Sequence, residues 1–497
     1  MKKIVFHLLT LLLLINCTNA QKKETTIVGR VIGEIPKEIQ YTIPLNGTFS
    51  RNFNQTLKPS INGEFLIKIN LDSPSFIEIL VANKLAKSFV VEAGKEYELI
   101  LDFTAETIKE QFKLSQNGER LLYQNFPLAG SVRGAISKIE ISKNVADINK
   151  EILSQKNKSM KLFNNLLSSN KIDQKLFDFI QMNNDVYYSA LIASIVTARF
   201  MKTNPNDFDK FPLETKQFWK SIFNKHELTE SKYLKSPFWT EYAKSYNDFK
   251  EYTHEDFGIE KITAIRQMAS EGKIHSYFLK KAENNLPEFS LEFYFANYII
   301  EELNKKRYEK ELIYLFNDFK AKYPTSKYID YLEPGIEKVK KFHKIVDDKS
   351  INRISFLDQY EKINTIKEVL ELFKGKRVYI DVWATWCGPC KEEFKHKKQL
   401  SKLLKTNNIE ILYISIDEEK RDEQWKKMIE FYNLEGKHLR ANKELTKDLQ
   451  RLFNDDGKIS IPWYLLVDEQ GNIIKNKAQR PSQLKALEKE INTVFKN

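Results

Sequence analysis

One stretch decides the fold of the C-terminal part of this chain: Trp383-Ala384-Thr385-Trp386-Cys387-Gly388-Pro389-Cys390. An apolar run at residues 378–383 comes just before the cysteine pair, and residues 391–405 follow with helical spacing. This order predicts a strand, a tight turn and a helix that begins at the first cysteine. The unpaired N–H groups and positive dipole end there favour thiolate, and can lower a cysteine pKa from about 8.5 into roughly the 3.5–7.5 range. The pair is therefore the predicted reaction centre.

A CxxC pair can also be a structural disulfide, a zinc site or a haem attachment site. A structural disulfide with so short a gap closes a very small loop, which constrains the unfolded chain little. A closed zinc site needs four ligands, and neither a second CxxC nor a nearby histidine pair is present. Covalent haem needs a histidine after the second cysteine, where Lys391 stands. A redox pair is favoured, and a structural disulfide stays open as the alternative.

The first twenty residues resemble a secretory leader. Lys2 and Lys3 precede an apolar stretch at 4–15 that is short for a membrane span, and residues 18–20 suit cleavage before Gln21. In the alternative interpretation this is a lipoprotein leader in which Cys17 carries a lipid tether. Both interpretations predict an exported protein of the periplasm or cell envelope, since no later run reaches membrane-spanning length.

Length and composition predict several folded domains. The chain has 497 residues, of which 42% are hydrophobic, which is ample for folded cores. Its formal charge of +12 is spread over many lysines. Since no basic stripe with interleaved aromatic residues stands out, we expect no nucleic-acid partner.

The periodicity of the chain changes twice after the leader. Residues 21–105 consist of short apolar runs separated by turn residues, which predicts a small antiparallel β-sandwich. Residues 106–345 repeat apolar side chains at three- and four-residue steps, which predicts a helical domain. Its aromatic stripes indicate a core, with a peptide-binding groove as the alternative. Residues 346–497 alternate strand and helix patterns, which predicts an α/β domain.

The motif at residues 381–390 resembles the signature of the thioredoxin fold, and Ile461-Pro462 resembles its second hallmark. Together they indicate similarity to the exported TlpA/ResA-like thiol-disulfide oxidoreductases, which makes 346–497 a predicted thioredoxin-like domain. The preceding β and helical parts resemble multidomain architectures of Bacteroidetes-type bacteria. The resemblance implies no metal and no cofactor other than the redox-active cysteine disulfide.

The resemblance also assigns catalytic roles. Cys387 is the expected exposed nucleophile that forms a mixed disulfide, and Cys390 is expected to resolve it. Asp381, on the strand beneath, is expected to have a raised pKa and to exchange a proton with Cys390. Many thioredoxins place a lysine beside this aspartate on the next strand, and Tyr413 is predicted to stand there instead.

Five residues are predicted to contact the substrate: Trp386, Gly388, Pro389, Ile461 and Pro462. By resemblance, the bond before the last of these is a cis peptide whose loop pairs with an extended substrate chain. Trp463 is expected either to border this surface or simply to pack.

The predicted function is reduction of protein disulfides outside the cytoplasm. Its partners would be disulfide-containing protein substrates and a membrane electron-donor protein. Two alternatives stay open: a redox-sensing protein whose N-terminal domains bind a partner, and a disulfide oxidase or isomerase. The reduction potential of the cysteine pair would distinguish a disulfide oxidase or isomerase from a reductase, because a difference of about 30 mV in this potential corresponds to about 1.4 kcal/mol.

Overall fold

The computed structural model describes residues 22–81, 85–104, 109–114, 132, 144–202, 212–344, 354–453 and 459–495. The chain forms two compact units, residues 1–258 and 259–497. The predicted leader, including Cys17, lies outside the described residues, and the predicted domain boundaries at 105 and 345 stay predictions. Within the described ranges, no helix is long and apolar enough to cross a membrane.

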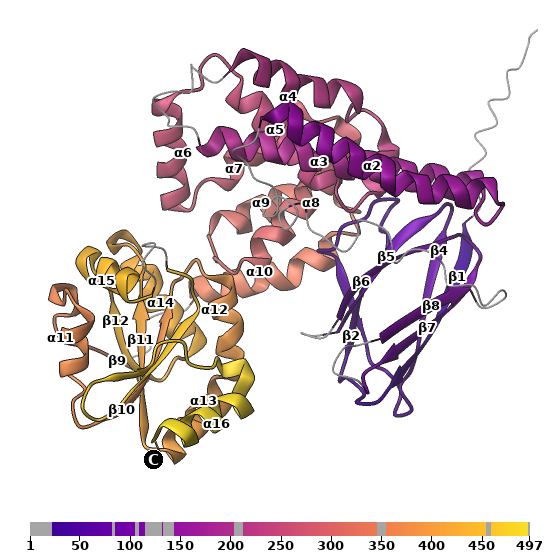
Figure 1. Ribbon diagram of the computed structural model, residues 1–497. Coiled ribbons are helices and arrows are strands. Elements are labelled where there is room, and N and C mark those ends of the chain that lie inside the picture. Colours follow the sequence, from indigo (N-terminus) through magenta and orange to yellow (C-terminus); the bar gives the residue numbers. More distant parts are fainter. Residues whose placement is uncertain are drawn as a thin grey trace, which may run out of the picture. The chain divides into compact units, whose positions relative to one another are not determined.

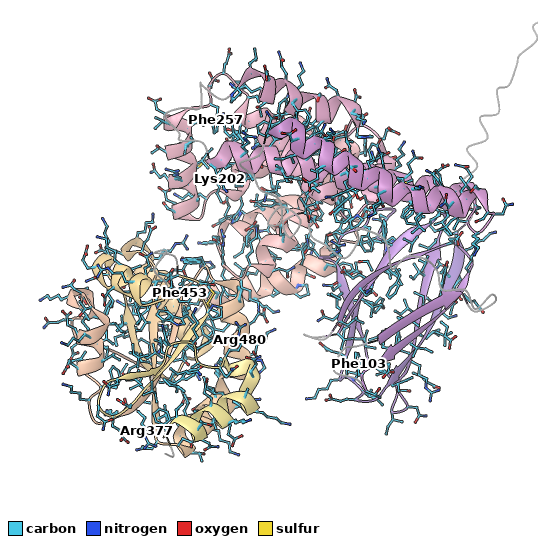
Figure 2. The ribbon with its side chains drawn as sticks, in the orientation of Figure 1. Phe103, Lys202, Phe257, Arg377, Phe453 and Arg480 are labelled. Atoms are coloured by element: carbon cyan, nitrogen blue, oxygen red, sulfur yellow. A yellow bond between two sulfur atoms is a disulfide. The ribbon has the colours of Figure 1, made fainter. Side chains whose placement is uncertain are left out.

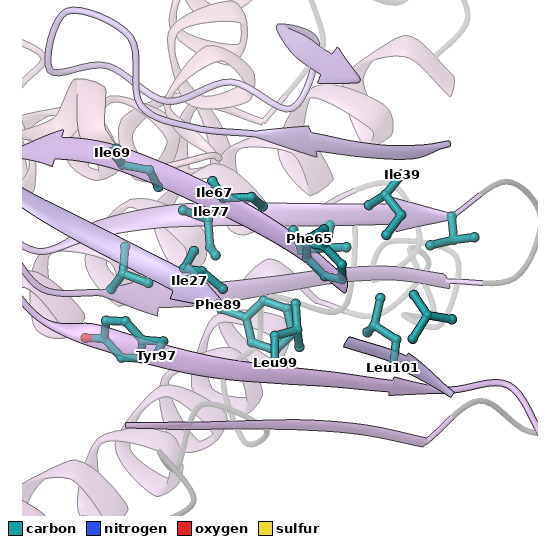
Figure 3. Packing of buried hydrophobic residues seen from close by; sticks show 14 of the residues in the cluster. Ile27, Ile39, Phe65, Ile67, Ile69, Ile77, Phe89, Tyr97, Leu99 and Leu101 are labelled. Carbon is teal, nitrogen blue, oxygen red and sulfur yellow. The ribbon is translucent and has the colours of Figure 1, made fainter. Parts of the chain in front are cut away.

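The first unit begins with two four-stranded sheets that share one core (Figures 1 and 3). The first sheet has the order β4-β1-β7-β8, with bounds Glu64–Leu71, Lys23–Ile32, Glu96–Asp102 and Lys109–Leu114. The second has the order β3-β2-β5-β6, with bounds Asn54–Leu57, Ile39–Thr42, Ser75–Val81 and Leu85–Val91. This arrangement confirms the predicted β-sandwich.

The core of the sandwich follows from alternation along its strands. In β4, exposed and buried residues alternate throughout, so that Phe65, Ile67 and Ile69 all face inward. Figure 3 shows Ile27, Phe65 and Leu99 among the packed side chains.

Two features of the sandwich differ from the sequence prediction. β1 and β7 pair in parallel, so the sheet is mixed and not purely antiparallel. β8 lies beyond residue 105, where helices were predicted, and pairs antiparallel with β7. The pairing of β1 with β7 depends on where strands distant in the sequence meet, which local periodicity does not encode.

Helices complete the first unit: α2 (Val145–Ser168), α3 (Gln174–Lys202), α4 (Leu213–Lys225) and α5 (Trp239–Tyr252). Their large aromatic side chains are buried, among them Trp219, Trp239 and Tyr242. The aromatic stripes are therefore core, as the first interpretation predicted.

The second unit begins with a helical segment: α6 (Ile259–Glu271), α7 (His275–Asn285), α8 (Glu288–Asn304), α9 (Glu311–Lys322) and α10 (Ile329–Lys344). Its C-terminal part is an α/β domain around a six-stranded sheet of order β14-β13-β10-β11-β12-β9. The strands span Ile473–Lys475, Trp463–Val467, Arg377–Trp383, Ile409–Ser415, Gly436–Arg440 and Ile354–Phe356. β9 to β12 run parallel, whereas β13 runs antiparallel to β10 and β14.

Helices cover both faces of this sheet (Figure 1). They are α11 (Ile366–Glu371), α12 (Gly388–Glu393), α13 (Lys397–Thr406), α14 (Asp422–Tyr432), α15 (Lys443–Phe453) and α16 (Leu484–Phe495). Val378, Ile380 and Val382 of β10 join the core on the α11 and α15 side, whereas Tyr379 joins the core on the α13 and α16 side. β10 is therefore buried on both faces, as a continuous apolar run predicts for a parallel strand. The predicted thioredoxin-like α/β architecture is confirmed.

Candidate active site

The cysteine pair lies where β10 passes into α12. Cys387 caps this helix, and its Sγ accepts a hydrogen bond from the backbone N–H of Cys390 at 3.1 Å. The two sulfur atoms form a disulfide with an S–S distance of 1.93 Å. The structure therefore represents the oxidised form, in which two electrons have already left the dithiol.

The predicted exposure of the nucleophile is wrong for this oxidised form. Cys387 is only 4% exposed, and Cys390 is fully buried. The neighbouring Trp386, by contrast, is 43% exposed. An exposed ring beside the disulfide is accessible to another molecule, so the predicted role of Trp386 in substrate contact is kept as a proposal.

The turn between the cysteines has the backbone that its sequence favours. Gly388 and Pro389 form the first turn of α12, where the missing N–H of proline costs little. The helix continues only to Glu393, and a 3₁₀ turn at 394–396 separates it from α13. The single helix predicted over 391–405 is thus two helices, and the Phe394 ring in the interruption packs edge-on against Trp383 at 5.2 Å.

Asp381 lies two residues before the end of β10 and is 1% exposed. Its Oδ1 has no hydrogen-bond partner among the described residues. Burial raises the pKa of this carboxyl well above its usual range, and the nearby Glu393 charge raises it further. The raised pKa favours the protonated form of this carboxyl, which can donate a proton, and it makes the ionised form a stronger base that can accept one.

A row of rings crosses the sheet at the level of Asp381. Tyr464 pairs with Asp381 from β13, and Tyr413 pairs with it from β11. Tyr413 stands beside Asp381, so no cation from β11 offsets the burial of the carboxyl. His438 of β12 follows in register and stacks on Tyr413, with ring centroids 4.9 Å apart. Burial lowers the pKa of His438 to about 4, so this ring is neutral.

The second hallmark lies at the start of β13. The Ile461–Pro462 peptide bond is cis, as the resemblance implied. Trp463 is buried, and its indole N–H donates to the Asn476 carbonyl at 2.5 Å. Since its ring also packs edge-on against Phe453, Trp463 is part of the core, which is the second of its two predicted roles.

A buried carboxylate that the sequence did not single out holds the turn before Cys387. Asp417 accepts the backbone N–H and the hydroxyl of Thr385, each at 2.7 Å, and also the Ser415 hydroxyl at 2.7 Å. These bonds connect the ends of β10 and β11. The position of Asp417 at the end of a parallel strand was the available signal, because such strand ends meet at one edge of a sheet.

Two more charged side chains of the redox helix are buried against expectation. Glu393 accepts the backbone N–H and hydroxyl of Ser482 at 2.8 and 3.0 Å and lies 3.7 Å from Arg480, which is labelled in Figure 2. Lys391 is fully buried directly after Cys390, and its ammonium donates to the Thr385 carbonyl. Burial lowers the pKa of Lys391 to about 7, against the opposing effect of the Glu309 charge.

No group of His, Cys, Asp or Glu in the part of the chain that the structure describes could hold a metal ion.

Residues 355–491 match the Redoxin family model. Curated relatives include the thiol-disulfide oxidoreductase ResA of Bacillus subtilis (strain 168), which is 29% identical over 116 residues that make up 23% of this chain and 60% of the relative. ResA of Bacillus thuringiensis subsp. konkukian is 30% identical over 107 residues, or 21% of this chain and 57% of the relative. The chain thus spans less than two thirds of the length of these relatives. They confirm the predicted resemblance to ResA-like proteins.

Solved structures with a similar part include a thiol:disulfide interchange protein from a Bacteroides species. It is 27% identical, with 25% of this chain and 78% of that chain covered and a TM-score of 0.21. The thioredoxin domain of a thiol-disulfide oxidoreductase from Bacteroides vulgatus is also 27% identical, with 25% and 84% covered and a TM-score of 0.21.

Proposed function

We propose that residues 355–491, which form a Redoxin-family domain, catalyse dithiol–disulfide exchange and reduce disulfides of protein substrates outside the cytoplasm. One observation carries the proposal: Cys387 caps α12 and is joined to Cys390 in a disulfide, at the end of the central strand of a Redoxin-family fold. The helix cap favours the thiolate form of Cys387 once the pair is reduced.

The reaction balances without a cofactor. The Cys387 thiolate attacks one sulfur of the substrate disulfide, that S–S bond breaks, and a substrate thiolate leaves. Cys390 then attacks Sγ of Cys387, which releases the second substrate thiolate and forms the enzyme disulfide. The substrate gains two electrons and two protons, and the enzyme loses them. A second dithiol, for which a membrane electron-donor protein is proposed, must reduce the enzyme for the next cycle.

Asp381 is proposed to supply the proton exchange at Cys390. A buried carboxyl with a raised pKa is a stronger base in its ionised form, so the Asp381 carboxylate can take the proton from the Cys390 thiol as that thiol attacks, and can return the proton later. The surface for the substrate is proposed to include the exposed Trp386 ring, the Gly388-Pro389 turn and the Ile461–Pro462 loop. Leader-like residues 1–20 support the location outside the cytoplasm, and Cys17 is the proposed lipid-tether site.

Insulin disulfide reduction by the full-length chain tests the proposal. Dithiothreitol serves as the dithiol, and Cys387→Ser is expected to reduce the rate to that of dithiothreitol alone. Activity that survives this substitution would exclude Cys387 as the nucleophile. The reduction potential of the pair, measured against glutathione, then decides the direction, because an oxidase would have a markedly higher potential.

A redox-sensing interaction protein is a second candidate. One observation favours it: side chains of the redox helix contact the helical segment of the same unit, so the state of the cysteine pair can affect that segment. Trapping separates the two candidates. A reductase in which Cys390→Ser blocks resolution retains many mixed-disulfide partners, whereas a sensor retains one.

A further inference from the structure

Residues 305–308, in the loop between α8 and α9, lie against α12, the helix that carries Cys390 and is capped by Cys387. A Cβ atom built on Gly388, between the two cysteines, would be 3.8 Å from the Lys305 carbonyl oxygen. Lys306 forms an ion pair with Glu392 on the first turns of α12. The loop is therefore next to the turn that carries both sulfur atoms.

Lys391 joins this loop to the turn before Cys387. Its buried ammonium donates to the Lys306 carbonyl at 2.7 Å and also to the Thr385 carbonyl. Thr385 is in turn fixed by Asp417 at 2.7 Å. The Lys391 side chain thus connects the backbone at residues 306 and 385, which are 79 positions apart in the sequence (385 − 306).

The rest of the loop contacts α14. The Arg307 carbonyl accepts from the Gln424 side-chain amide at 3.1 Å, and the Tyr308 hydroxyl lies 2.8 Å from the Tyr432 hydroxyl. The Tyr308 ring also packs on Phe431, with centroids 5.1 Å apart.

The backbone of the loop adopts conformations that are unfavourable for an isolated peptide. Lys306 and Tyr308 both have positive φ, 53° and 59°, which disfavours residues with a Cβ atom. Such conformations persist only where the surrounding contacts over-determine them. The contacts with Lys391, Gln424 and Tyr432 supply this constraint.

We propose that residues 305–308 are a wall of the active site, and that Lys391 is the positioning residue that holds this wall beside Cys387. The wall restricts bulky molecules on their way to the nucleophile, so it selects substrates whose disulfide lies on a slender or extended segment. The inference rests on the proposed function only in so far as Cys387 is the nucleophile.

Two measurements on full-length Lys391→Met test the inference. The first is hydrogen exchange of the loop amides in the oxidised protein, among them Lys306 N–H, which bonds to the Leu303 carbonyl. Loss of the two hydrogen bonds that the Lys391 side chain donates should accelerate this exchange by about tenfold or more. The second is the rate at which reduced Cys387, identified by peptide mapping, reacts with a polyethylene-glycol maleimide of protein size relative to N-ethylmaleimide. Both reagents react with the same thiolate, so the ratio of their rates does not depend on the thiolate fraction of Cys387. The ratio should rise severalfold when residues 305–308 are no longer held in place.

Lys398→Met is the matched control, because Lys398 is an exposed lysine of α13, and both measurements should keep wild-type values. If Lys391→Met does not fold, Tyr308→Phe removes the bond to Tyr432 and should accelerate loop exchange by roughly two- to tenfold. Loop exchange that stays at the wild-type rate, or faster exchange with an unchanged rate ratio, would overturn the inference. Neither measurement requires turnover, so failure of the proposed function would appear separately, as absent insulin reduction by the wild-type protein.

Discussion

Replacing Asp381 by Asn should change how the stability of the C-terminal domain depends on pH. The folded pKa of Asp381 lies well above the unfolded value of 3.8, because burial and then the Glu393 charge disfavour ionisation. A raised folded pKa gives stability that is fully present below the unfolded pKa and is lost as pH rises towards the folded pKa. Asn cannot ionise, so the variant lacks this loss.

The magnitude follows from the linkage relation. Each pH unit between the two pKa values costs the wild-type protein about 1.4 kcal/mol of unfolding free energy. From about pH 5 to about pH 7, the wild type should therefore lose up to about 2.7 kcal/mol relative to Asp381→Asn. Any cost of burying the amide is constant with pH, so it changes the offset between the proteins and not the slope.

Hydrogen exchange of the β10 amides measures this difference, because a chain with several cores does not unfold in a single step. The free energy of opening is obtained at each pH after correction for the intrinsic exchange rate. Asp358→Asn is the control, since Asp358 is exposed and its loss should leave the slope unchanged. A difference between wild type and Asp381→Asn that stays constant over this pH range would refute the reasoning, and with it the raised pKa that the proposed mechanism uses.

Three further predictions concern the same site. Tyr413→Lys should place an ammonium beside Asp381, lower the pKa of the carboxyl, and shrink the pH slope described above; an unchanged slope would contradict this. Thr385→Val should lower the free energy of opening at β10 by about 1.5–3 kcal/mol, because the buried Asp417 carboxylate loses the hydrogen bond from the Thr385 hydroxyl. A decrease below about 0.5 kcal/mol would mean that this hydrogen bond does not stabilise the strand. Cys390→Ser should accumulate mixed disulfides with reduced turnover, visible on non-reducing gels, and their absence would argue against attack by Cys387.

Much of the site could be predicted from local sequence. The order of an apolar run, CGPC and a helical pattern determines β10, the turn and α12, because each signal depends on neighbouring residues. The position of Tyr413 beside Asp381 was predicted from the family resemblance, and the register of β10 and β11 confirms it. The pKa of Asp381 was expected to be raised, because burial in a strand disfavours the charged form of a carboxyl.

The contacts of Lys391 could not be predicted in this way. A lysine after a CxxC pair has no local feature that would indicate full burial. Its acceptors are carbonyl oxygens, one of them 85 residues away, and every residue has a carbonyl. The parallel pairing of β1 with β7 escaped prediction for a similar reason, because it depends on which strands meet and not on the composition of either.

The wall at residues 305–308 accepts two hydrogen bonds, from Lys391 and Gln424, through backbone carbonyls and not through side chains. This affects how the sequences of related chains can diverge at the contact. The carbonyls of Lys306 and Arg307 remain whatever side chains stand at these two positions, so Lys391 and Gln424 can keep these two bonds when the side chains change. Paired substitutions that report these two bonds would therefore be absent even though the bonds are maintained. Methods that infer proximity from correlated changes would overlook it, and a helical segment transplanted from a distant relative could still dock if its backbone followed the same path.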